Sequence, residues 1–147
     1  MKIAIGADHG GRSHKDAIKS FLEAQNIEVI DFGTFSDVSV DYNDYALKVA
    51  HAVVNKEVDK GILICGTGIG MSVMANKVKG IRAALVHDLF TAKATREHND
   101  TNILAMGGRV ISIELALQIV DIWVHTEFSN DERHVRRIGK IDSYTGE

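Results

Sequence analysis

The chain has 147 residues, 45% hydrophobic and 25% charged, so we expect residues 1–147 to form a single domain with a core of its own. Its formal net charge of −3 excludes a bulk electrostatic attraction to nucleic acid or to an anionic membrane. With one cysteine, no apolar run long enough to span a bilayer and no secretory signal pattern, the expected location is the cytoplasm.

Apolar strand patterns and amphipathic helix patterns alternate along the chain. Strands are predicted over residues 2–6, 27–31, 62–65, 82–86 and 103–106. Helices are predicted over residues 12–25, 41–55, 71–77, 89–97 and 113–128, and from 131 to about 141. This alternation is typical of right-handed βαβ crossovers. We therefore expect a Rossmann-like, three-layer α/β/α fold with a five-stranded parallel sheet and a C-terminal helix.

The segments that follow the predicted strands are where a ligand is expected. In open parallel sheets, ligands bind beyond the carboxyl ends of the strands, near the point where the strand order reverses. Those segments are residues 7–11, 32–34, 65–70, 87–88 and 107–109.

One of these segments joins a glycine-rich turn to the only cysteine. Cys65 ends an apolar run and is followed by Gly66, Gly68 and Gly70 before a predicted helix. Bare amides at a helix N-terminus favour an anion, and a thiol there has a reason to be acidic. Two plainer interpretations stay open, a small buried cysteine and a turn that binds nothing. A dinucleotide fingerprint fits poorly because Met71 stands where its third glycine would be, and no Walker P-loop sequence follows.

Polar residues near the other strand ends suit proton transfer and hydrogen bonding. His98 lies in a polar run expected to be a loop, and an imidazole there could exchange a proton at neutral pH. With Cys65 it would suit either a thiol nucleophile pair or an acid–base pair acting on a sugar. Asp8 and His9 follow the first strand and could contact hydroxyl groups, although Asp8 could instead cap the first helix.

Arginines near the C-terminus suit a phosphate group. Arg133 and Arg137 are spaced i, i+4 and project from one face of the predicted terminal helix. Arg109, directly after the fifth strand, is a further phosphate or hydroxyl contact. A solvated basic face is the alternative for the terminal pair. The histidines show no metal-ligand spacing, so no zinc site is expected.

Taken together, these segments resemble the ribose-5-phosphate isomerase B family, which includes galactose-6-phosphate isomerase subunits. The resemblance covers nearly the whole chain and rests on residues 3–11, 29–34, 61–70, 75–77, 80–83 and 96–102 and on the Arg133-His-x-x-Arg137 pattern. It implies a cytoplasmic aldose–ketose isomerase of carbohydrate metabolism that acts through an enediolate without metal or nucleotide. It also implies a homodimer, or a tetramer of dimers, with sites built at the subunit interface.

The resemblance also implies roles for individual residues. Cys65 would move the proton between C1 and C2, while Thr67 and His98 would assist ring opening. The remaining implied substrate contacts are Asp8, His9, Gly66, Gly68, Ile69, Gly70, Asn99, Arg109, Arg133 and Arg137. Some family members use a carboxylate base further along the glycine helix, but residues 71–75 carry no acid here. Asn43 stands where the family often has proline, which bears on loop rigidity more than on chemistry.

Several functions remain compatible with these residues. The leading hypothesis is interconversion of ribose 5-phosphate and ribulose 5-phosphate. A hexose-6-phosphate isomerase acting on allose or galactose 6-phosphate needs only a deeper pocket. A non-catalytic sugar-phosphate or nucleotide sensor would keep the glycine turn and the arginines without requiring both Cys65 and His98. A thiol hydrolase would use that pair to form a covalent acyl intermediate instead.

Overall fold

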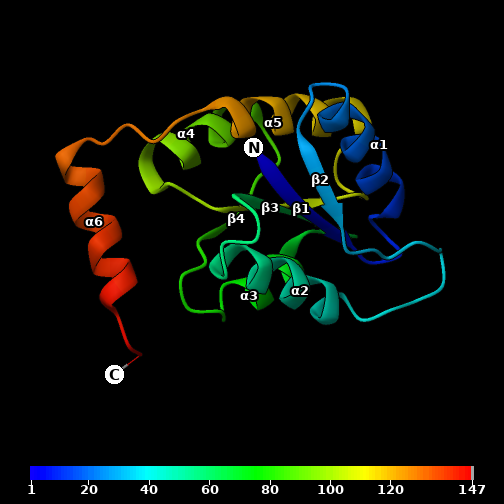
Figure 1. Ribbon diagram of the computed structural model, residues 1–147, viewed down its shortest axis with the longest axis horizontal. Coiled ribbons are helices and arrows are strands. Elements are labelled where there is room, and N and C mark those ends of the chain that lie inside the picture. The colour runs from blue at the N-terminus through cyan, green and yellow to red at the C-terminus, as the bar shows by residue number, and fades with distance from the viewer. Residues whose placement is uncertain (147) are drawn as a thin grey trace.

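A computed structural model describes residues 1–146 and contains one parallel sheet with helices on both of its faces (Figure 1). The strands are β1 (Lys2–Ala7), β2 (Glu28–Asp31), β3 (Lys60–Cys65), β4 (Ala83–Leu85) and β5 (Ile103–Gly107). The helices are α1 (Arg12–Glu23), α2 (Tyr42–Val54), α3 (Ile69–Ala75), α4 (Leu89–Asn99), α5 (Ile113–His125) and α6 (Glu132–Ser143). The predicted three-layer α/β/α fold is therefore confirmed.

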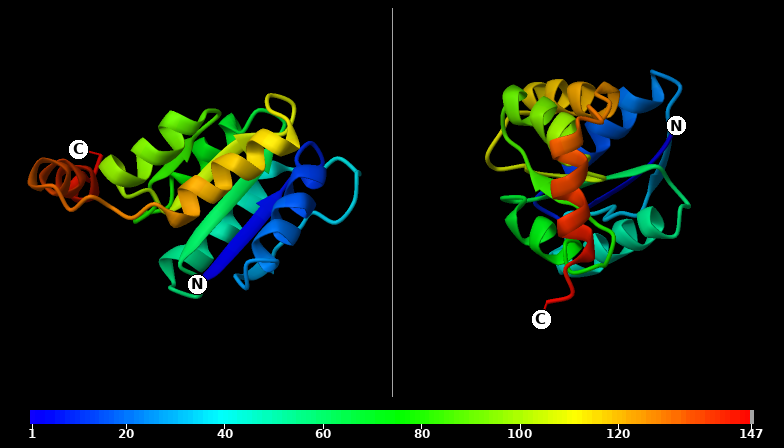
Figure 2. Two further views of the ribbon diagram at one scale, coloured as in Figure 1. Left: turned by 90° about the horizontal axis from the view of Figure 1, so that it is seen from above. Right: turned by 90° about the vertical axis from the view of Figure 1, so that its left-hand side faces the viewer.

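The sheet order determines where a ligand can bind. Its five strands are all parallel and run in the order β2-β1-β3-β5-β4. The direction of winding reverses between β1 and β3, which opens a crevice beyond the carboxyl ends of these two strands. Helices α2 and α3 cover one face of the sheet, α1, α4 and α5 cover the other, and α6 extends to one side (Figures 1 and 2). Within residues 1–146, no helix combines the length and the apolar composition needed to cross a membrane.

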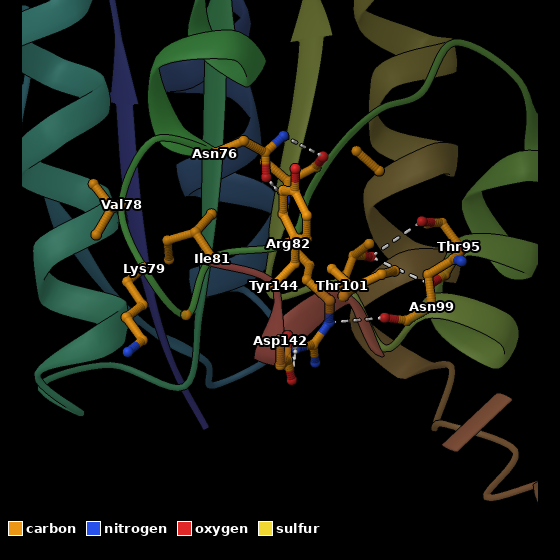
Figure 3. Close-up of a pocket in the computed structure, with 14 residues that line it drawn as sticks. Asn76, Val78, Lys79, Ile81, Arg82, Thr95, Asn99, Thr101, Asp142 and Tyr144 are labelled. Atoms are coloured by element: carbon orange, nitrogen blue, oxygen red, sulfur yellow. Dashed lines mark hydrogen bonds and ion pairs between the residues drawn. The ribbon is translucent and has the colours of Figure 1, made fainter. Parts of the chain in front are cut away.

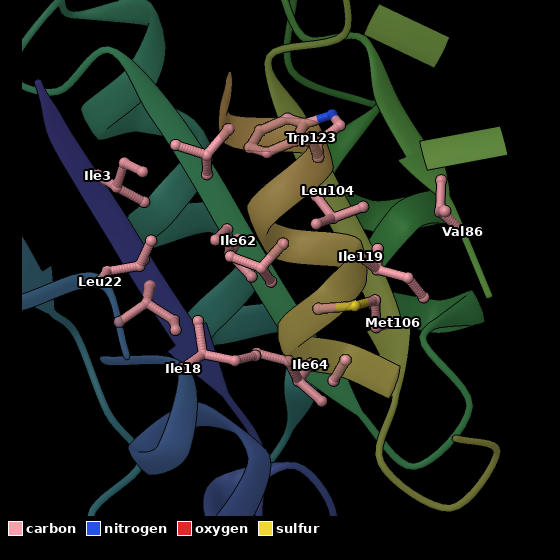
Figure 4. Close-up of a cluster of buried hydrophobic side chains, with 14 of the residues drawn as sticks. Ile3, Ile18, Leu22, Ile62, Ile64, Val86, Leu104, Met106, Ile119 and Trp123 are labelled. Carbon is pink, nitrogen blue, oxygen red and sulfur yellow. The ribbon is translucent and has the colours of Figure 1, made fainter. Parts of the chain in front are cut away.

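The residues of β3 alternate between two hydrophobic clusters. Ile62 and Ile64 belong to a cluster with side chains of α1 and α5, among them Trp123 (Figure 4). Leu63 and Cys65 belong to the cluster on the opposite face, with α2 and α3. Because successive side chains of a strand point to opposite faces, the apolar run that contains the cysteine also determines which helix layer the thiol faces.

Two element boundaries differ from the sequence-based expectation in ways that affect the site. The polar run around His98 was expected to be a loop, but α4 continues through it to Asn99, and Asp100 caps the helix with φ of 46°. Its last turn is held by the Arg96 side chain, which donates to the Thr101 carbonyl at 2.6 Å. Helix α3 begins two residues earlier than expected, at Ile69, because the turn at Gly68 is already complete.

A buried ion pair fixes α1 against the end of β2. The Lys15 side chain is 0% exposed, and its Nζ donates to Asp31 Oδ2 at 2.7 Å and to Asp16 Oδ1 at 2.9 Å. Asp31 uses its other carboxylate oxygen to accept the Gly33 amide at 2.9 Å. The pair therefore ties the helix after β1 to the segment that leaves β2.

Replacing this lysine should be costly for stability. Lys15→Met removes the buried cation from the Asp31 carboxylate, which is 8% exposed, and leaves only the half-exposed Lys19 near it. We therefore expect the free energy of unfolding to fall by about 3 kcal/mol. Urea denaturation would measure the change. Lys19→Met is the matched control, because Lys19 lies 3.8 Å from the same carboxylate but is 38% exposed. The control should lose less than about 1 kcal/mol. Equal losses of unfolding free energy in the two variants would contradict the argument that the buried Lys15 stabilises the fold more than the exposed Lys19.

Candidate active site

The turn after β3 brings a backbone amide onto the cysteine sulfur. Cys65 is the last residue of β3 and is 5% exposed, and its Sγ accepts a hydrogen bond from the Gly68 amide at 3.1 Å. Gly68 has φ of 78°, a conformation that side-chain-bearing residues rarely adopt. A Cβ at this position would also lie 2.6 Å from Leu85 Cδ1 and 2.7 Å from the Met106 carbonyl carbon. The glycine is therefore required for the turn that holds the thiol.

A pocket of about 500 Å³ opens around this turn, at the crevice between β1 and β3. It is lined by Asp8, Tyr42, Cys65, Gly66, Thr67, Ile69, Gly70, Val73 and Arg109. Seven of these were predicted as site residues from the sequence, and one chain brings them together. Gly68 lies at the same turn behind the sulfur.

The lining of this pocket is rich in hydrogen-bond donors. The amides of Gly66, Thr67 and Gly70 donate no hydrogen bond within the described part of the chain. The Arg109 guanidinium reaches over the same turn, with its Nη1 3.2 Å from the position of a Cβ on Gly66. The Thr67 hydroxyl is exposed and accepts the Ile69 amide at 3.3 Å. Donors arranged in this way suit oxygens that carry or develop negative charge.

The two polar residues after β1 have different surroundings. Asp8 is 7% exposed and its Oδ1 accepts the Gly10 amide at 2.9 Å, which leaves the carboxylate in the pocket wall. It does not cap α1, because Gly11 occupies the N-cap position without any side-chain bond. His9 is not among the lining residues of this pocket, and its Nδ1 accepts the Val40 amide at 3.2 Å.

His98 lies in a different layer of the fold from Cys65. It is exposed in the last turn of α4, in a groove that includes Phe90 and Glu97. Its ring lies 4.6 Å from that of His134 on α6, and the His134 Nδ1 is 2.9 Å from the Ser129 hydroxyl. Cys65 faces the α2–α3 layer, so a single chain does not bring the predicted proton-transfer pair together.

The two arginines predicted to grip the phosphate from the terminal helix also lie outside the Cys65 pocket of their own chain, unlike Arg109, which lines it. Arg133 and Arg137 are both exposed on α6, as the i, i+4 spacing predicted. The Arg133 Nε lies 3.6 Å from Asp131, whereas Arg137 has no ion pair within residues 1–146. Asn99 ends α4, and its carbonyl accepts from the Arg82 Nε at 3.0 Å.

A second cavity, of about 510 Å³, lies between the amino end of β4, the end of α4 and the end of α6 (Figure 3). Its polar groups are largely committed to one another. Arg82 binds the Asp142 carboxylate at 2.9 and 3.0 Å, and the Asn76 amide donates to and accepts from the Ala83 backbone. This cavity is marginally larger, but the Cys65 sulfur and the unpaired amides belong to the other pocket.

The sequence did not single out Tyr42 as a site residue. It is the first residue of α2 and lines the Cys65 pocket. Its ring packs where Gly70 has no side chain, since a Cβ there would lie 2.6 Å from the Tyr42 Cζ. The available signal was its place at the start of a helix that follows a strand, because such helix starts lie at the ligand-binding edge.

Comparison with known proteins gives one consistent result. The profile of the protein family described as Ribose/Galactose Isomerase matches residues 3–141. The chain is 49% identical to ribose-5-phosphate isomerase B of Escherichia coli, over 95% of this chain and 93% of that protein.

Solved structures agree with the sequence comparison. Ribose-5-phosphate isomerase B of Clostridium thermocellum superimposes with a TM-score of 0.95 at 56% identity, over 97% of this chain and 95% of that one. The Mycoplasma genitalium enzyme of the same name, solved with bound ribulose 5-phosphate, gives a TM-score of 0.93 at 41% identity, over 97% and 95% of the two chains.

The turn at Gly68 can be tested by substitution. Gly68→Ala places a Cβ in a left-handed backbone conformation and against Met106, so the free energy of unfolding should fall by about 1–3 kcal/mol. Gly139→Ala is the control, because the added Cβ meets nothing within 4 Å on α6. It should leave stability unchanged or raise it by about 0.5–1 kcal/mol. Thermal and urea unfolding would measure both, and a stable Gly68→Ala protein would refute the steric argument.

Proposed function

The chain belongs to the ribose/galactose isomerase family and is an isomerase, and we propose that it interconverts ribose 5-phosphate and ribulose 5-phosphate. The observation that carries the proposal is the Cys65 sulfur, which receives the Gly68 amide at 3.1 Å in a pocket lined by unpaired amides. This arrangement offers a proton acceptor next to donors for oxygen. Proton transfer between neighbouring carbons of a sugar requires both.

In the proposed reaction, Cys65 acts as the base. The thiolate removes the proton from C2 of the open-chain aldose, and the electron pair forms the C1–C2 double bond of an enediolate. The amides of Gly66, Thr67 and Gly70 and the Arg109 guanidinium stabilise the negative oxygen as it develops. The thiol then returns the proton to C1, while the oxygen on C1 takes up a proton and the hydroxyl on C2 gives one up. This leaves the carbonyl at C2 and yields the ketose.

We propose that a second copy of the chain completes each site with His98. Support comes from the layers: Cys65 faces α2 and α3, whereas His98 lies on α4 across the sheet. Exposed apolar side chains stand at both places, with Ile69 and Val73 at the pocket 54% and 57% exposed and Phe90 beside His98 79% exposed. Pairing two copies would cover these side chains and set His98 of one copy against Cys65 of the other.

The same pairing would supply the phosphate contacts. In its own chain the Cys65 pocket contains one arginine, Arg109, and one carboxylate, Asp8, which is a poor balance for a dianionic phosphate. Helix α6 extends away from the sheet and exposes Arg133 and Arg137 (Figure 2). We propose that α6 of one copy brings these arginines to the sugar phosphate in the other, while His98 and Thr67 assist ring opening.

The role of Cys65 predicts a separation of binding from catalysis. Cys65→Ala should abolish isomerisation but leave the affinity for ribose 5-phosphate nearly intact, because binding relies on amides and guanidinium groups. Activity would be followed by a coupled assay and affinity by calorimetry. In deuterated water, the wild type should exchange the substrate C2 hydrogen with solvent and the variant should not. Retained turnover in Cys65→Ala would exclude it as the base.

The shared site predicts complementation between inactive variants. A heterodimer of Cys65→Ala with His98→Asn contains one site with both changes and one with neither, so it should recover about half of the wild-type activity. Two affinity tags would isolate the heterodimer, and each homodimeric variant would serve as the control. An inactive heterodimer would place both residues in the site of the same chain.

The choice of sugar is tested in the same assay. Ribose 5-phosphate, allose 6-phosphate and galactose 6-phosphate would be compared by kcat/KM, with ribose 5-phosphate expected to give the highest value. A higher value for either hexose phosphate would assign the enzyme to six-carbon substrates. Binding without turnover of any of the three would instead favour a sugar-phosphate sensor.

A further inference from the structure

His87 lies just beyond the end of the edge strand β4, next to the last residue of β5. Strand β4 ends at Leu85, and the last backbone bond to β5 runs from the Val86 amide to the Ala105 carbonyl at 3.0 Å. Two residues further along, β5 still pairs with β3 but has no strand on its β4 side, and there the Gly107 amide donates to His87 Nε2 at 2.9 Å. The imidazole therefore takes the place of the next carbonyl in the ladder.

The segment that begins with this bond forms part of the Cys65 pocket. Directly after Gly107, the Gly108 amide donates to the Cys65 carbonyl at 2.8 Å and the Arg109 amide donates to the Gly66 carbonyl at 3.0 Å. Three successive amides thus have fixed acceptors, and the first acceptor is a side chain. Holding Gly107 sets the position from which Arg109 reaches over the turn.

The bond requires a neutral imidazole. An amide N–H can be accepted only by a nitrogen without a proton, so Nε2 is bare and the ring proton is on Nδ1. Burial lowers the pKa of His87, and the Asp88 carboxylate opposes this by favouring the charged form. Asp88 is itself fixed, because its Oδ1 accepts the Thr91 amide at 2.7 Å.

We propose that His87 is a positioning residue for the isomerase reaction, whose neutral ring holds Gly107 and thereby places Arg109 and the Cys65 turn. Acidification protonates the ring, breaks this bond and loosens the Arg109 segment while the rest of the fold stays intact. The expected loss of isomerase activity at low pH rests on the proposed function. The hydrogen bond between Gly107 and His87, and its loss on protonation, are independent of that function.

Two substitutions of His87 distinguish the effect of losing the hydrogen-bond acceptor from the effect of protonating it. His87→Gln keeps an oxygen acceptor at a similar reach but cannot titrate, whereas His87→Leu removes the acceptor. At about pH 7.5, kcat/KM for ribose 5-phosphate should stay within about twofold in the glutamine variant and fall about tenfold in the leucine variant. Between about pH 7.5 and 5.5, the wild type should lose more activity than the glutamine variant, because only the wild type has an acceptor at residue 87 that can be protonated. Every other histidine is the same in the two proteins.

The stability of the folded protein should also decrease as the pH falls. The folded pKa of His87 lies below its unfolded value of about 6.5, so the bond contributes fully above about pH 6.5 and its contribution is lost as the pH falls through the folded pKa. The melting temperature of the wild type should therefore fall further than that of His87→Gln over this range.

The amide itself gives a readout that is independent of turnover. The ¹⁵N shift of Gly107 should move with pH in the wild type and stay constant in His87→Gln. A wild-type shift that does not titrate, identical pH–activity profiles, or full activity in His87→Leu would each overturn the proposal. If the wild type fails to isomerise ribose 5-phosphate, the proposed function fails, and the Gly107 shift still decides the role of His87.

Discussion

The site depends on direct contact between the backbones of the loops that leave β1, β3 and β5. The Gly108 amide binds the Cys65 carbonyl at 2.8 Å, and a Cβ on Gly108 would lie 2.6 Å from the Gly10 carbonyl oxygen. A Cβ on Gly107 would lie 2.7 Å from the backbone of Thr67. Because no side chain separates these segments, the three strand ends cannot shift independently. The amides that line the pocket are consequently held in place before any ligand arrives.

Polar side chains hold the margins of this glycine-packed centre. On the β2 side, the Lys15–Asp31 pair anchors the segment after the strand, and the His9 ring accepts the Val40 amide. On the β4 side, the His87 ring accepts the Gly107 amide. Close contact between backbones fixes the loops after β1, β3 and β5 at the centre of the site. Charged or polar side chains, such as the Lys15–Asp31 pair and His87, fix the segments on either side. Acidification should therefore act first on the β4 edge, where burial lowers the pKa of His87.

The alternation of β3 has a larger consequence than its effect on the core. It points Cys65 toward α2 and α3, while His98 belongs to α4 and Arg137 to α6 beyond the sheet. Each chain thus presents a pocket with a buried thiol and free backbone amides, and separately presents His98 and Arg137 outside that pocket. The proposed pairing of two copies would place His98 and Arg137 of one copy at the Cys65 pocket of the other.

The sequence by itself determined the order of the elements, the α/β/α layering and the glycine turn at Cys65. These follow from local hydrophobic periodicity and from glycine spacing, and the structure confirms each of them. It also identified most of the pocket, because residues after parallel strands gather at one edge. The helical setting of His98, the packing of Tyr42 on Gly70 and the bond from Gly107 to His87 emerged only in three dimensions. Each of these depends on where a strand ends or which layer a helix joins, and such distances between segments remote in the chain are decided by tertiary packing.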